Sequence, residues 1–385
     1  MKKKIAILIN SIQGGGAERA AVQLLHELKN DFEFHLVMLT DIIEYELPAG
    51  QKIICFEQPG HQNIIIKFLT LPLYAYRYKK YCRKHGIEKS LSFLTRSHYI
   101  NSLSKLFGSR SEIILSEQAH VSTYLKSLGK FNESVSKFLT KKLYAKADLI
   151  ITNAELIKTD LQKKFHIDTR FSVVHNPLNL TKIAWLSAEE VPADYFDTFT
   201  YINIGSFRPQ KNHALLIDAF NKIRHLNCRL LLLGKEGKNQ AATYQKVKEL
   251  DLEDRIIFAG FDINPFKFLS RANCFVLSSD FEGFPNVLQE ALACKLPVIS
   301  TDCKSGPREI LAPGTDIDHT ATKDIEIAEF GILVPIKNEE LLAKAMTLMY
   351  TDATLRDAFK EKGFERARAF DTPHIISRFR EILDS

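Results

Sequence analysis

Short apolar segments alternate with longer amphipathic segments along the whole chain of 385 residues. This alternation is typical of α/β proteins, in which helices cover a largely parallel sheet. In the first half we predict strands at residues 4–9, 33–39, 53–56, 89–94, 112–116, 148–152 and 171–175. In the second half we predict strands at residues 201–205, 229–233, 255–259, 274–278, 297–301 and 331–335, with helices at 339–370 and 373–384. So many strands fit two sheets better than one.

The predicted fold class is α/β, with two doubly wound Rossmann-like domains. Residues 176–199 separate the two sheets, because they contain the turn Asn176-Pro177 and a polar, helix-poor stretch at 189–194. We assign residues 1–185 to an N-terminal domain and residues 195–370 to a C-terminal domain. Ligands of such sheets bind beyond the carboxyl ends of the strands. Two domains facing a cleft should therefore carry their motifs directly after strands.

Composition narrows the class of protein. With 45% hydrophobic and 25% charged residues, the chain is of globular type and neither disordered nor collagen-like. Its six cysteines are scattered without Cys-x-x-Cys spacing, which predicts reduced, mostly buried thiols in the cytoplasm. The apolar run near the start is too short for a signal peptide, and no run reaches the roughly 18 apolar residues of a spanning helix.

The net charge of +6 is unevenly distributed. Between residues 58 and 110, Glu88 is the only acidic residue, whereas ten residues are basic. Within this part, the basic region at 64–85 mixes aliphatic and tyrosine side chains with cations, which suits contact with an anionic membrane surface. A core helix with a solvated basic edge is an equally good interpretation. Nucleic acid fits less well, because no recognised binding motif accompanies the patch.

The densest candidate chemistry lies at residues 280–293. Pro285 suits the first turn of a helix that continues to residue 293, so Glu282 lies on the loop before the helix and Glu290 about two turns inside. The backbone amides and the positive dipole end of this helix predict a phosphate or diphosphate site. Two carboxylates beside an anion site need another partner, and a carboxylate can accept two hydrogen bonds from the diol of a sugar or ribose. The motif therefore predicts a nucleotide-sugar site.

Two more loops follow predicted strands. Gly14, Gly15 and Gly16 precede a helix, where glycine permits close approach to an anion, but their spacing matches neither the dinucleotide fingerprint nor a Walker motif. A plain tight turn is the alternative. Arg208 and Lys211 follow the strand at 201–205 and suit a diphosphate leaving group, whose charge grows as its bond to the sugar breaks. Solvated surface charge is the alternative for these two residues.

His120 is the strongest histidine candidate. It follows the strand at 112–116 and could contact an acceptor hydroxyl or the sugar, although a lone histidine is more often structural. His98, His175 and His213 rank below it. The sequence has no Gly-x-Ser-x-Gly elbow, no His-Glu-x-x-His helix and no Asp-x-Asp pair of metal-binding type. We therefore expect neither a hydrolase nor a metal or cofactor requirement.

Taken together, these motifs resemble the family 4 glycosyltransferases, retaining enzymes of the GT-B fold, here of the bacterial surface-glycan type. The resemblance covers most of the chain and is carried by residues 15–18, by the loop after Gly205, and above all by the Glu-x7-Glu motif from Glu282 to Glu290, followed by 297–301 and 306–310. It implies that Glu290 holds the ribose of the donor and that Glu282 lies beside the transferred sugar. The other implied donor contacts are Gly15, Gly16, Gly283, Phe284, Pro285, Asn286, Val287 and Leu288.

The resemblance also implies that Arg208 and Lys211 stabilise the departing diphosphate and that a final helix at 372–385 packs back on the first domain. Near His120 the correspondence is loose, and Gln118 could occupy its place. The family commonly has an arginine directly after the loop glycine, where this chain has Ser206. The acidic segment at 312–330 is longer than the usual connection, and we interpret it as a surface loop.

We therefore expect a cytoplasmic, metal-independent, retaining glycosyltransferase at the membrane periphery. It would transfer a hexose or N-acetylhexosamine from a UDP-sugar to a lipid-linked or surface-polysaccharide acceptor. The residues provide no evident nucleophile, so front-face attack, in which the leaving diphosphate helps to remove the acceptor proton, is favoured. The alternatives are a nucleotide-sugar epimerase of the same fold and a non-catalytic sugar-nucleotide-binding protein.

Overall fold

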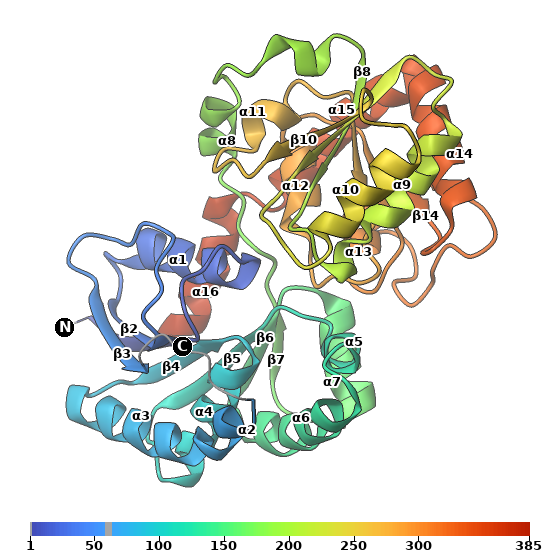
Figure 1. The fold of residues 1–385 in the computed structure, drawn as a ribbon. Coiled ribbons are helices and arrows are strands. Elements are labelled where there is room, and N and C mark those ends of the chain that lie inside the picture. The colour runs from blue at the N-terminus through green and yellow to red at the C-terminus, as the bar shows by residue number, and fades with distance from the viewer. Residues whose placement is uncertain (1, 58–63) are drawn as a thin grey trace. The chain divides into compact units, whose positions relative to one another are not determined.

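The computed structural model describes residues 2–57 and 64–385. The first residues of the basic stretch, 58–63, lie outside the described part. The chain forms two compact units, one of Met1–Pro177 with Pro373–Ser385 and one of Leu178–Thr372 (Figure 1). The predicted N-terminal domain runs to residue 185, whereas in the structure α8 (Leu180–Leu186) belongs to the second unit. There the side-chain amide of Asn264 donates to the carbonyl of Leu186 at 2.9 Å.

The first unit contains a parallel sheet of seven strands in the order β3-β2-β1-β4-β5-β6-β7. The strands are β1 (Lys4–Ile9), β2 (Glu33–Thr40), β3 (Lys52–Glu57), β4 (Lys89–Phe93), β5 (Glu112–Glu117), β6 (Leu149–Thr152) and β7 (Phe171–Val173). The helices are α1 (Gly16–Leu28), α2 (Ile64–Leu69), α3 (Leu71–His85), α4 (Thr95–Leu106), α5 (Val121–Lys126), α6 (Lys130–Leu143), α7 (Glu155–Phe165) and α16 (Thr372–Asp384), with a 3₁₀ turn η1 (Tyr144–Lys146).

The second unit contains a sheet of seven strands in the order β10-β9-β8-β11-β12-β14-β13, in which only β13 is antiparallel to its neighbour. The strands are β8 (Phe199–Ile204), β9 (Cys228–Leu233), β10 (Ile256–Gly260), β11 (Cys274–Leu277), β12 (Val298–Thr301), β13 (Glu326–Ile327) and β14 (Ile332–Val334). Besides α8, the helical elements are η2 (Ala193–Phe196), η3 (Pro209–Lys211), α9 (His213–Lys222), α10 (Gln240–Glu249), α11 (Phe266–Leu269), α12 (Asn286–Ala293), α13 (Pro307–Leu311), α14 (Glu339–Thr351) and α15 (Ala353–Arg368).

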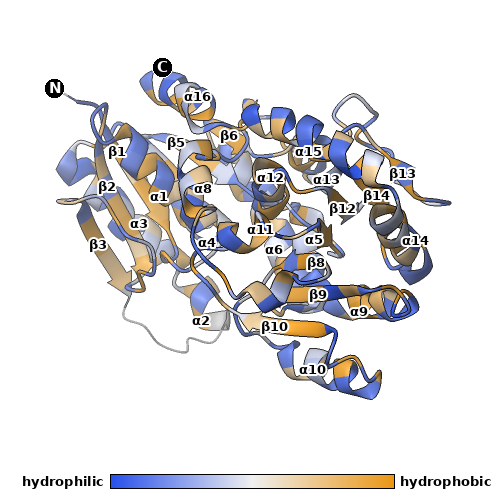
Figure 2. Ribbon diagram, turned by 90° about the horizontal axis from the view of Figure 1, so that it is seen from above, coloured by the Kyte–Doolittle hydropathy of each residue, from blue (hydrophilic) through white to orange (hydrophobic). Residues whose placement is uncertain are grey.

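Each sheet reverses its strand order once, and this confirms the doubly wound α/β fold class. The reversal lies between β1 and β4 in the first unit and between β8 and β11 in the second. Helices pack on both faces of such sheets, so even edge strands stay apolar. Figure 2 shows the edge strands β3 and β10 mostly in hydrophobic colours. The crevice beside a reversal is where doubly wound sheets bind ligands.

Three predicted elements differ from the structure. The single helix expected at 339–370 is divided at Asp352, whose carboxylate accepts the amide hydrogen of Leu355 and thereby caps α15. Pro285 precedes α12 in an extended conformation and is not in its first turn. The segment at 312–330 is not wholly a surface loop, because β13 pairs with β14 and adds a strand to the sheet.

All six cysteines are free thiols, of which four are buried, while Cys55 and Cys294 are partly exposed. Among the described residues, none of the helices combines the length and the apolar content that crossing a membrane requires.

Candidate functional site

Two of the loops predicted to bind the donor meet at the strand reversal of the second unit. Lys211 follows β8 at the end of η3, and Glu282 follows β11. The Lys211 ammonium lies 2.7 Å from the Glu282 carboxylate. The stem of Lys211 passes Gly205, where a Cβ would come within 3.3 Å of it. The structure thus brings two of the predicted residues into direct contact.

Glu282 is buried at 7% exposure and held from several sides. Its carboxylate accepts hydrogen bonds from the Ser279 hydroxyl at 2.6 Å and from the Gln210 side-chain amide at 3.4 Å. Its backbone amide donates to the carbonyl of Lys304 at 2.9 Å, and the amide of Ser305 donates to the carbonyl of Glu282 at 3.1 Å. The carboxylate is therefore fixed in position and its charge is compensated. Sequence reasoning missed Ser279 and Gln210, which lack any motif of their own.

Gly306 packs the loop after β12 directly against the start of the Glu-x7-Glu motif. Its φ of +92° is in the left-handed region, and a Cβ there would lie 2.7 Å from the carbonyl oxygen of Gly283 and 2.6 Å from the ring of Pro285. The neighbouring Ser305 hydroxyl donates to the same carbonyl of Gly283 at 2.7 Å. Only glycine fits at residue 306, and the motif loop is fixed by this contact.

The other predicted donor-binding residues lie on and before α12. Glu290 is buried at 4% exposure, and Phe284 packs edge-on against Phe370 with ring centroids 5.6 Å apart. At Pro285, the residue before α12, no side-chain hydrogen bond caps the start of the helix. Gly283, Asn286 and Val287 are half-buried, whereas Phe284, Pro285 and Leu288 are buried. Residues at the start of α12 are thus partly exposed beside the Lys211 and Glu282 pair.

The remaining donor-side residues have unequal surroundings. Arg208 is exposed at the start of η3. His213 is buried, stacks on Phe207 with ring centroids 4.6 Å apart, and has its pKa lowered to about 4 by burial and, secondly, by the charge of Lys211. Burial thus favours the neutral form of the His213 imidazole, which packs against Phe207. Asn212 caps α9 with its side chain and also donates to Asp280 at 2.9 Å, so it links the two loops.

The glycine turn after β1 leads into α1, with Gly15 as the residue before the helix. A Cβ on Gly15 would fall 2.2 Å from a carboxylate oxygen of Glu18, which therefore covers the helix start at this point. The amide of Gly14 donates to the Glu44 carboxylate at 3.1 Å. Gly16 is exposed. Glu18 and Glu44 thus lie against the glycine turn in this structure.

His120 is buried at the start of α5, directly beyond β5. Its Nδ1 lies 2.9 Å from the Thr123 hydroxyl and 3.8 Å from the Asp160 carboxylate. The preceding Glu117 is fully buried, and burial raises the pKa of its carboxyl to about 7. Sequence reasoning missed both carboxylates. Glu117 could have been found from its position three residues before His120, whereas nothing in the sequence marks Asp160.

The lower-ranked histidines of the first unit are engaged elsewhere. His98 is fully buried, with Nδ1 2.9 Å from the Ser92 hydroxyl, and burial lowers its pKa to about 3. His175 lies with Nδ1 2.8 Å from the carbonyl of Asn153. Gln118, the alternative to His120, is half-buried on the turn before α5.

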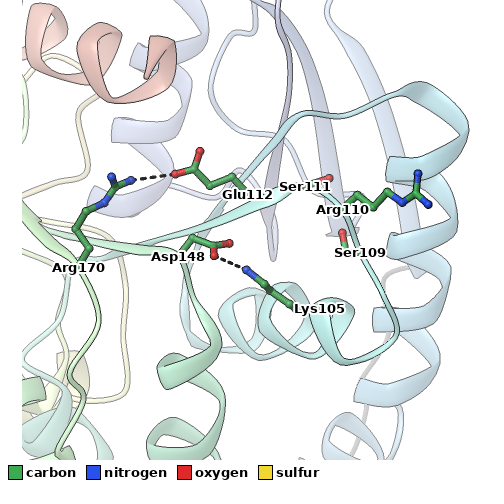
Figure 3. A pocket seen from close by; sticks show the side chains of 7 residues that line it. All are labelled: Lys105, Ser109, Arg110, Ser111, Glu112, Asp148 and Arg170. Atoms are coloured by element: carbon green, nitrogen blue, oxygen red, sulfur yellow. Dashed lines mark hydrogen bonds and ion pairs between the residues drawn. The ribbon is translucent and has the colours of Figure 1, made fainter.

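A shallow pocket of the first unit lies at the opposite, amino-terminal ends of β5 to β7 (Figure 3). In it, Arg170 pairs with Glu112 at 3.0 Å, and Lys105 pairs with Asp148. These cations are already compensated by acids, and the pocket is at the wrong end of the strands for a ligand of this fold. Within residues 2–57 and 64–385, no group of three or more acidic, histidine or cysteine side chains is arranged to hold a metal ion.

Several known proteins that this chain is similar to in sequence are named as glycosyltransferases. Residues 190–366 match the family model described as glycosyl transferases group 1. Over 371 residues the chain is 38% identical to the N-acetylgalactosamine-N,N'-diacetylbacillosaminyl-diphospho-undecaprenol 4-alpha-N-acetylgalactosaminyltransferase of Campylobacter jejuni, with 96% of each protein covered. It is 30% identical to the lipopolysaccharide 1,6-galactosyltransferase of Escherichia coli over 49% of this chain and 52% of that protein.

Solved structures share the fold at low identity. Sucrose-phosphate synthase from Thermosynechococcus elongatus aligns with a TM-score of 0.79 and 20% identity, over 100% of this chain and 98% of that chain. HepE of Anabaena, in complex with UDP, aligns with a TM-score of 0.75 and 17% identity, over the full length of both chains.

Proposed function

This chain belongs to the group 1 glycosyl transferases and has the GT-B fold, and on that premise we propose that it is a retaining enzyme acting on a UDP-sugar. It transfers a hexose or N-acetylhexosamine to a lipid-linked or surface-polysaccharide acceptor. The observation that carries the donor assignment is the ion pair of Lys211 and Glu282 at the strand reversal, next to the start of α12.

In the proposed reaction the second unit holds the donor. Glu290 accepts hydrogen bonds from the ribose, and the amides at the start of α12 bind sugar hydroxyls and diphosphate. Lys211 and the exposed Arg208 stabilise the diphosphate as its charge grows, and they supply this charge from side chains, without a metal or other cofactor. Glu282 holds Lys211 in place and lies at the sugar side. The UDP complex of HepE supports testing uridine donors first.

The first unit supplies the acceptor side. His120 contacts the acceptor hydroxyl or the sugar, and Gly15 and Gly16 approach the diphosphate. Attack occurs on the face from which the diphosphate leaves, so the leaving group takes the acceptor proton and the anomeric configuration is retained. The Campylobacter jejuni relative is named for transfer to a diphospho-undecaprenol glycan. That name makes a polyprenyl-diphosphate-linked glycan the first acceptor to test.

The test is release of UDP that depends on the acceptor. Wild-type protein is incubated with UDP-N-acetylgalactosamine or UDP-glucose, with and without a polyprenyl-diphosphate-linked sugar, and the product linkage is read by NMR. We expect acceptor-dependent UDP and an α-linked product. Conversion of the donor to an isomer without acceptor would indicate an epimerase, and donor-dependent thermal stabilisation without any product would indicate a binding protein.

Two variants test the site itself. Lys211→Ala should lower transfer by about 100-fold or more, the usual effect of removing a charge-stabilising group. Glu290→Ala should lower it by about 10-fold or more, because the ribose hydroxyls lose a charged hydrogen-bond acceptor. Lys222→Ala removes a lysine of the same unit, on α9, that pairs with Glu340 on the surface. This control should stay within about twofold of wild type, because surface substitutions rarely act at a distance. Wild-type rates of transfer and donor hydrolysis in both site variants would refute the donor assignment.

We propose further that the basic region at 64–85 attaches the protein to the cytoplasmic face of the membrane. In α3 one face is buried through residues such as Tyr74 and Tyr78, while Leu73 and Tyr76 are about half exposed. Leu69 at the end of α2 is 75% exposed. The Lys79 and Lys80 ammonium groups lie 5.8 and 5.6 Å from the ring centroid of Tyr76.

This outward face combines features of an interfacial surface, since apolar side chains reach the acyl boundary while cations meet anionic headgroups. Its exposed cations include Lys67, Arg77, Lys80, Arg83 and Lys84. Leu106 and Phe107 are also exposed, and the ring of Phe107 lies edge-on to Tyr76 at 6.2 Å. A core helix with a solvated basic edge accounts for the cations and the buried face but leaves these exposed apolar groups unexplained.

Co-sedimentation with vesicles tests this attachment. Lys80→Glu with Arg83→Glu should reduce binding to vesicles containing phosphatidylglycerol by more than about tenfold, because each cation near such a surface contributes roughly 1 kcal/mol. The matched control, Lys238→Glu with Lys248→Glu, makes the same charge change at exposed positions of the second unit. An equal loss of vesicle binding in both double variants would show that binding depends on the net charge of the protein and not on this surface.

A further inference from the structure

Two buried carboxylates of the first unit hold the backbone on either side of His120. Glu117, 3% exposed at the end of β5, accepts the amide hydrogens of Gln118 and Ala119, each at 3.0 Å. Asp160, 5% exposed on α7, accepts the amide hydrogen of Ser122 at 2.8 Å. The turn that leads to His120 and the helix start that follows it are therefore each tied to a separate secondary-structure element.

The Glu117 carboxylate is itself fixed from behind. Its second oxygen accepts the hydroxyl hydrogen of Tyr144 at 2.7 Å and lies 3.8 Å from Nε2 of His98. Tyr144 and His98 are fully buried, and their rings meet edge-on at 5.5 Å. A carboxylate held by packed aromatic groups cannot follow a shift of the turn, so it defines where the turn lies.

The imidazole of His120 is held through the same frame. Thr123, one turn into α5, has its hydroxyl 2.9 Å from Nδ1, and the Asp160 carboxylate that binds the Ser122 amide lies 3.8 Å from the same nitrogen. Buried carboxylates carry a large desolvation penalty and are uncommon without a partner or a role. Apolar residues could fix this turn by packing alone. The presence of two buried carboxylates around one histidine therefore indicates that the imidazole of His120 must be placed accurately.

We propose that Glu117 and Asp160 are positioning residues that set the location and orientation of His120 at the acceptor side. The inference rests on the proposed function, in which His120 contacts the acceptor or the sugar. Neither carboxylate needs to touch substrate, and each acts through the backbone hydrogen bonds that it accepts. Misplacement by about 1 Å of a group that orients the substrate lowers a rate by roughly 100-fold, so loss of either tie should appear mainly in kcat.

A double-mutant cycle tests this proposal. Glu117→Ala should lower kcat by about 10- to 100-fold in the wild-type background, with the KM for the donor within about threefold. In the His120→Ala background the same substitution should change kcat by less than about twofold, because Glu117 acts only through His120. An equal factor in both backgrounds, or no loss in the first, would overturn the proposal. Asp160→Ala is expected to behave in the same way.

Conservative and control variants separate positioning from general damage. Glu117→Gln keeps an oxygen acceptor for both amides and should recover kcat to within about threefold of wild type. A loss as large as that of Glu117→Ala would overturn the positioning role. Glu112→Ala removes the carboxylate at the other end of β5, where it pairs with Lys89 and Arg170, and should leave kcat within about twofold of wild type.

NMR and amide exchange test the positioning role without relying on the transfer activity. The ring resonances of His120, assigned by loss in His120→Ala, should move in Glu117→Ala and stay near their wild-type positions in Glu117→Gln. Amide exchange at Gln118 and Ala119 should quicken only in Glu117→Ala. Unchanged resonances and exchange in Glu117→Ala would overturn the proposal even if the wild type proved inactive, whereas a wild type without transfer activity would refute the proposed function alone.

Discussion

Lys211 and Glu282 form an ion pair in which the Glu282 side chain is buried and the Lys211 side chain is 17% exposed. Removing one partner of such a pair leaves a buried charge without compensation, which destabilises more than removing both. We therefore predict that Lys211→Met lowers the free energy of unfolding by about 2 kcal/mol or more. In Lys211→Met combined with Glu282→Gln, about half of that loss should be recovered, because Ser279 and Gln210 can still hydrogen-bond the amide.

Urea titration monitored by circular dichroism measures both variants. Lys246→Met is a matched control, because Lys246 pairs with Asp218 at 2.7 Å at a more exposed site of the same unit. Exposed pairs contribute about 0–1 kcal/mol, so the control should change little. A double variant less stable than Lys211→Met alone would contradict the uncompensated-charge argument.

Glu117 gives a second prediction at this scale, in the dependence of stability on pH. Burial raises the pKa of its carboxyl from 4.5 to about 7, against the lowering effect of the Tyr144 hydroxyl and of two backbone amides. The folded state therefore holds this proton more tightly than the unfolded state. The groups that face it are His98 and Tyr99 on α4, Tyr124 on α5, Tyr144 on η1 and Asp160 on α7.

A raised carboxyl pKa makes stability fall as the pH rises from 4.5 to 7, by roughly 3 kcal/mol in full. Glu117→Gln removes this titration, so the melting temperature of the variant relative to wild type should rise between pH 5 and pH 8. Scanning calorimetry across that range measures the difference. A difference that does not change with pH would show that the carboxyl does not titrate in this window.

At the scale of elements, the acidic segment at 312–330 is anchored to a buried arginine. Arg308 on α13 lies 2.5 Å from Asp302 and 2.7 Å from Glu326 of β13. The Thr315 hydroxyl accepts from the same guanidinium at 3.0 Å, and the amide of Ala321 donates to Asp302 at 2.6 Å. The segment thus returns three times to one ion-pair cluster beside the loop that holds Glu282.

Glu326→Ala should therefore loosen the whole segment. We predict a loss of about 1–3 kcal/mol, since a buried guanidinium loses one of its two carboxylates, and faster proteolysis between residues 313 and 325. Limited proteolysis with mass spectrometry measures the cleavage. Asp324→Ala, which removes the exposed pair with Lys344, should leave the rate nearly unchanged. Equal sensitivity in both variants would contradict the anchoring role of Arg308.

Elements were more predictable from the sequence than contacts. The strand at 4–9 has the predicted bounds and the helix at 286–293 ends at the predicted residue, because their apolar patterns end at turn or cap residues. The two-residue strand β13 was missed, since so short an edge strand has no periodicity. Asp352 was a usable helix-start signal within 339–370, but the apolar pattern continues through it.

The candidate site was predicted in its motifs and not in its contacts. The spacing of Glu282 and Glu290 is local, so a helix start could be inferred from it. The contact of Lys211 with Glu282 joins residues 71 positions apart and depends on β8 lying beside β11 in the sheet. Burial of Glu117 and Asp160 around His120 likewise depends on the order of β5 and β6 and on where α7 packs. Such proximity follows from topology, which a single sequence specifies only weakly.

At the scale of the whole molecule, the chain crosses from the first unit to the second and returns at its end. Ile375, Ile376, Phe379 and Leu383 of α16 are buried in the same core as β1, β2 and α1. This places the predicted final helix in the first unit. Each unit has its own apolar core, so stability of the first unit depends on residues that follow the entire second unit in sequence.

Phe379→Ala tests this dependence. Deleting a buried phenylalanine side chain removes about 3–5 kcal/mol, so amide exchange monitored by mass spectrometry should quicken in peptides from β1, β2 and α1. Peptides from β8, β9 and β11 should keep their wild-type rates, because they belong to the other core. Arg378→Ala, an exposed neighbour on the same helix, is the control and should change neither set. Faster exchange confined to α16 itself would show that the first unit is stable without its final helix. Faster exchange in β8 to β11 would show that the two cores do not unfold separately.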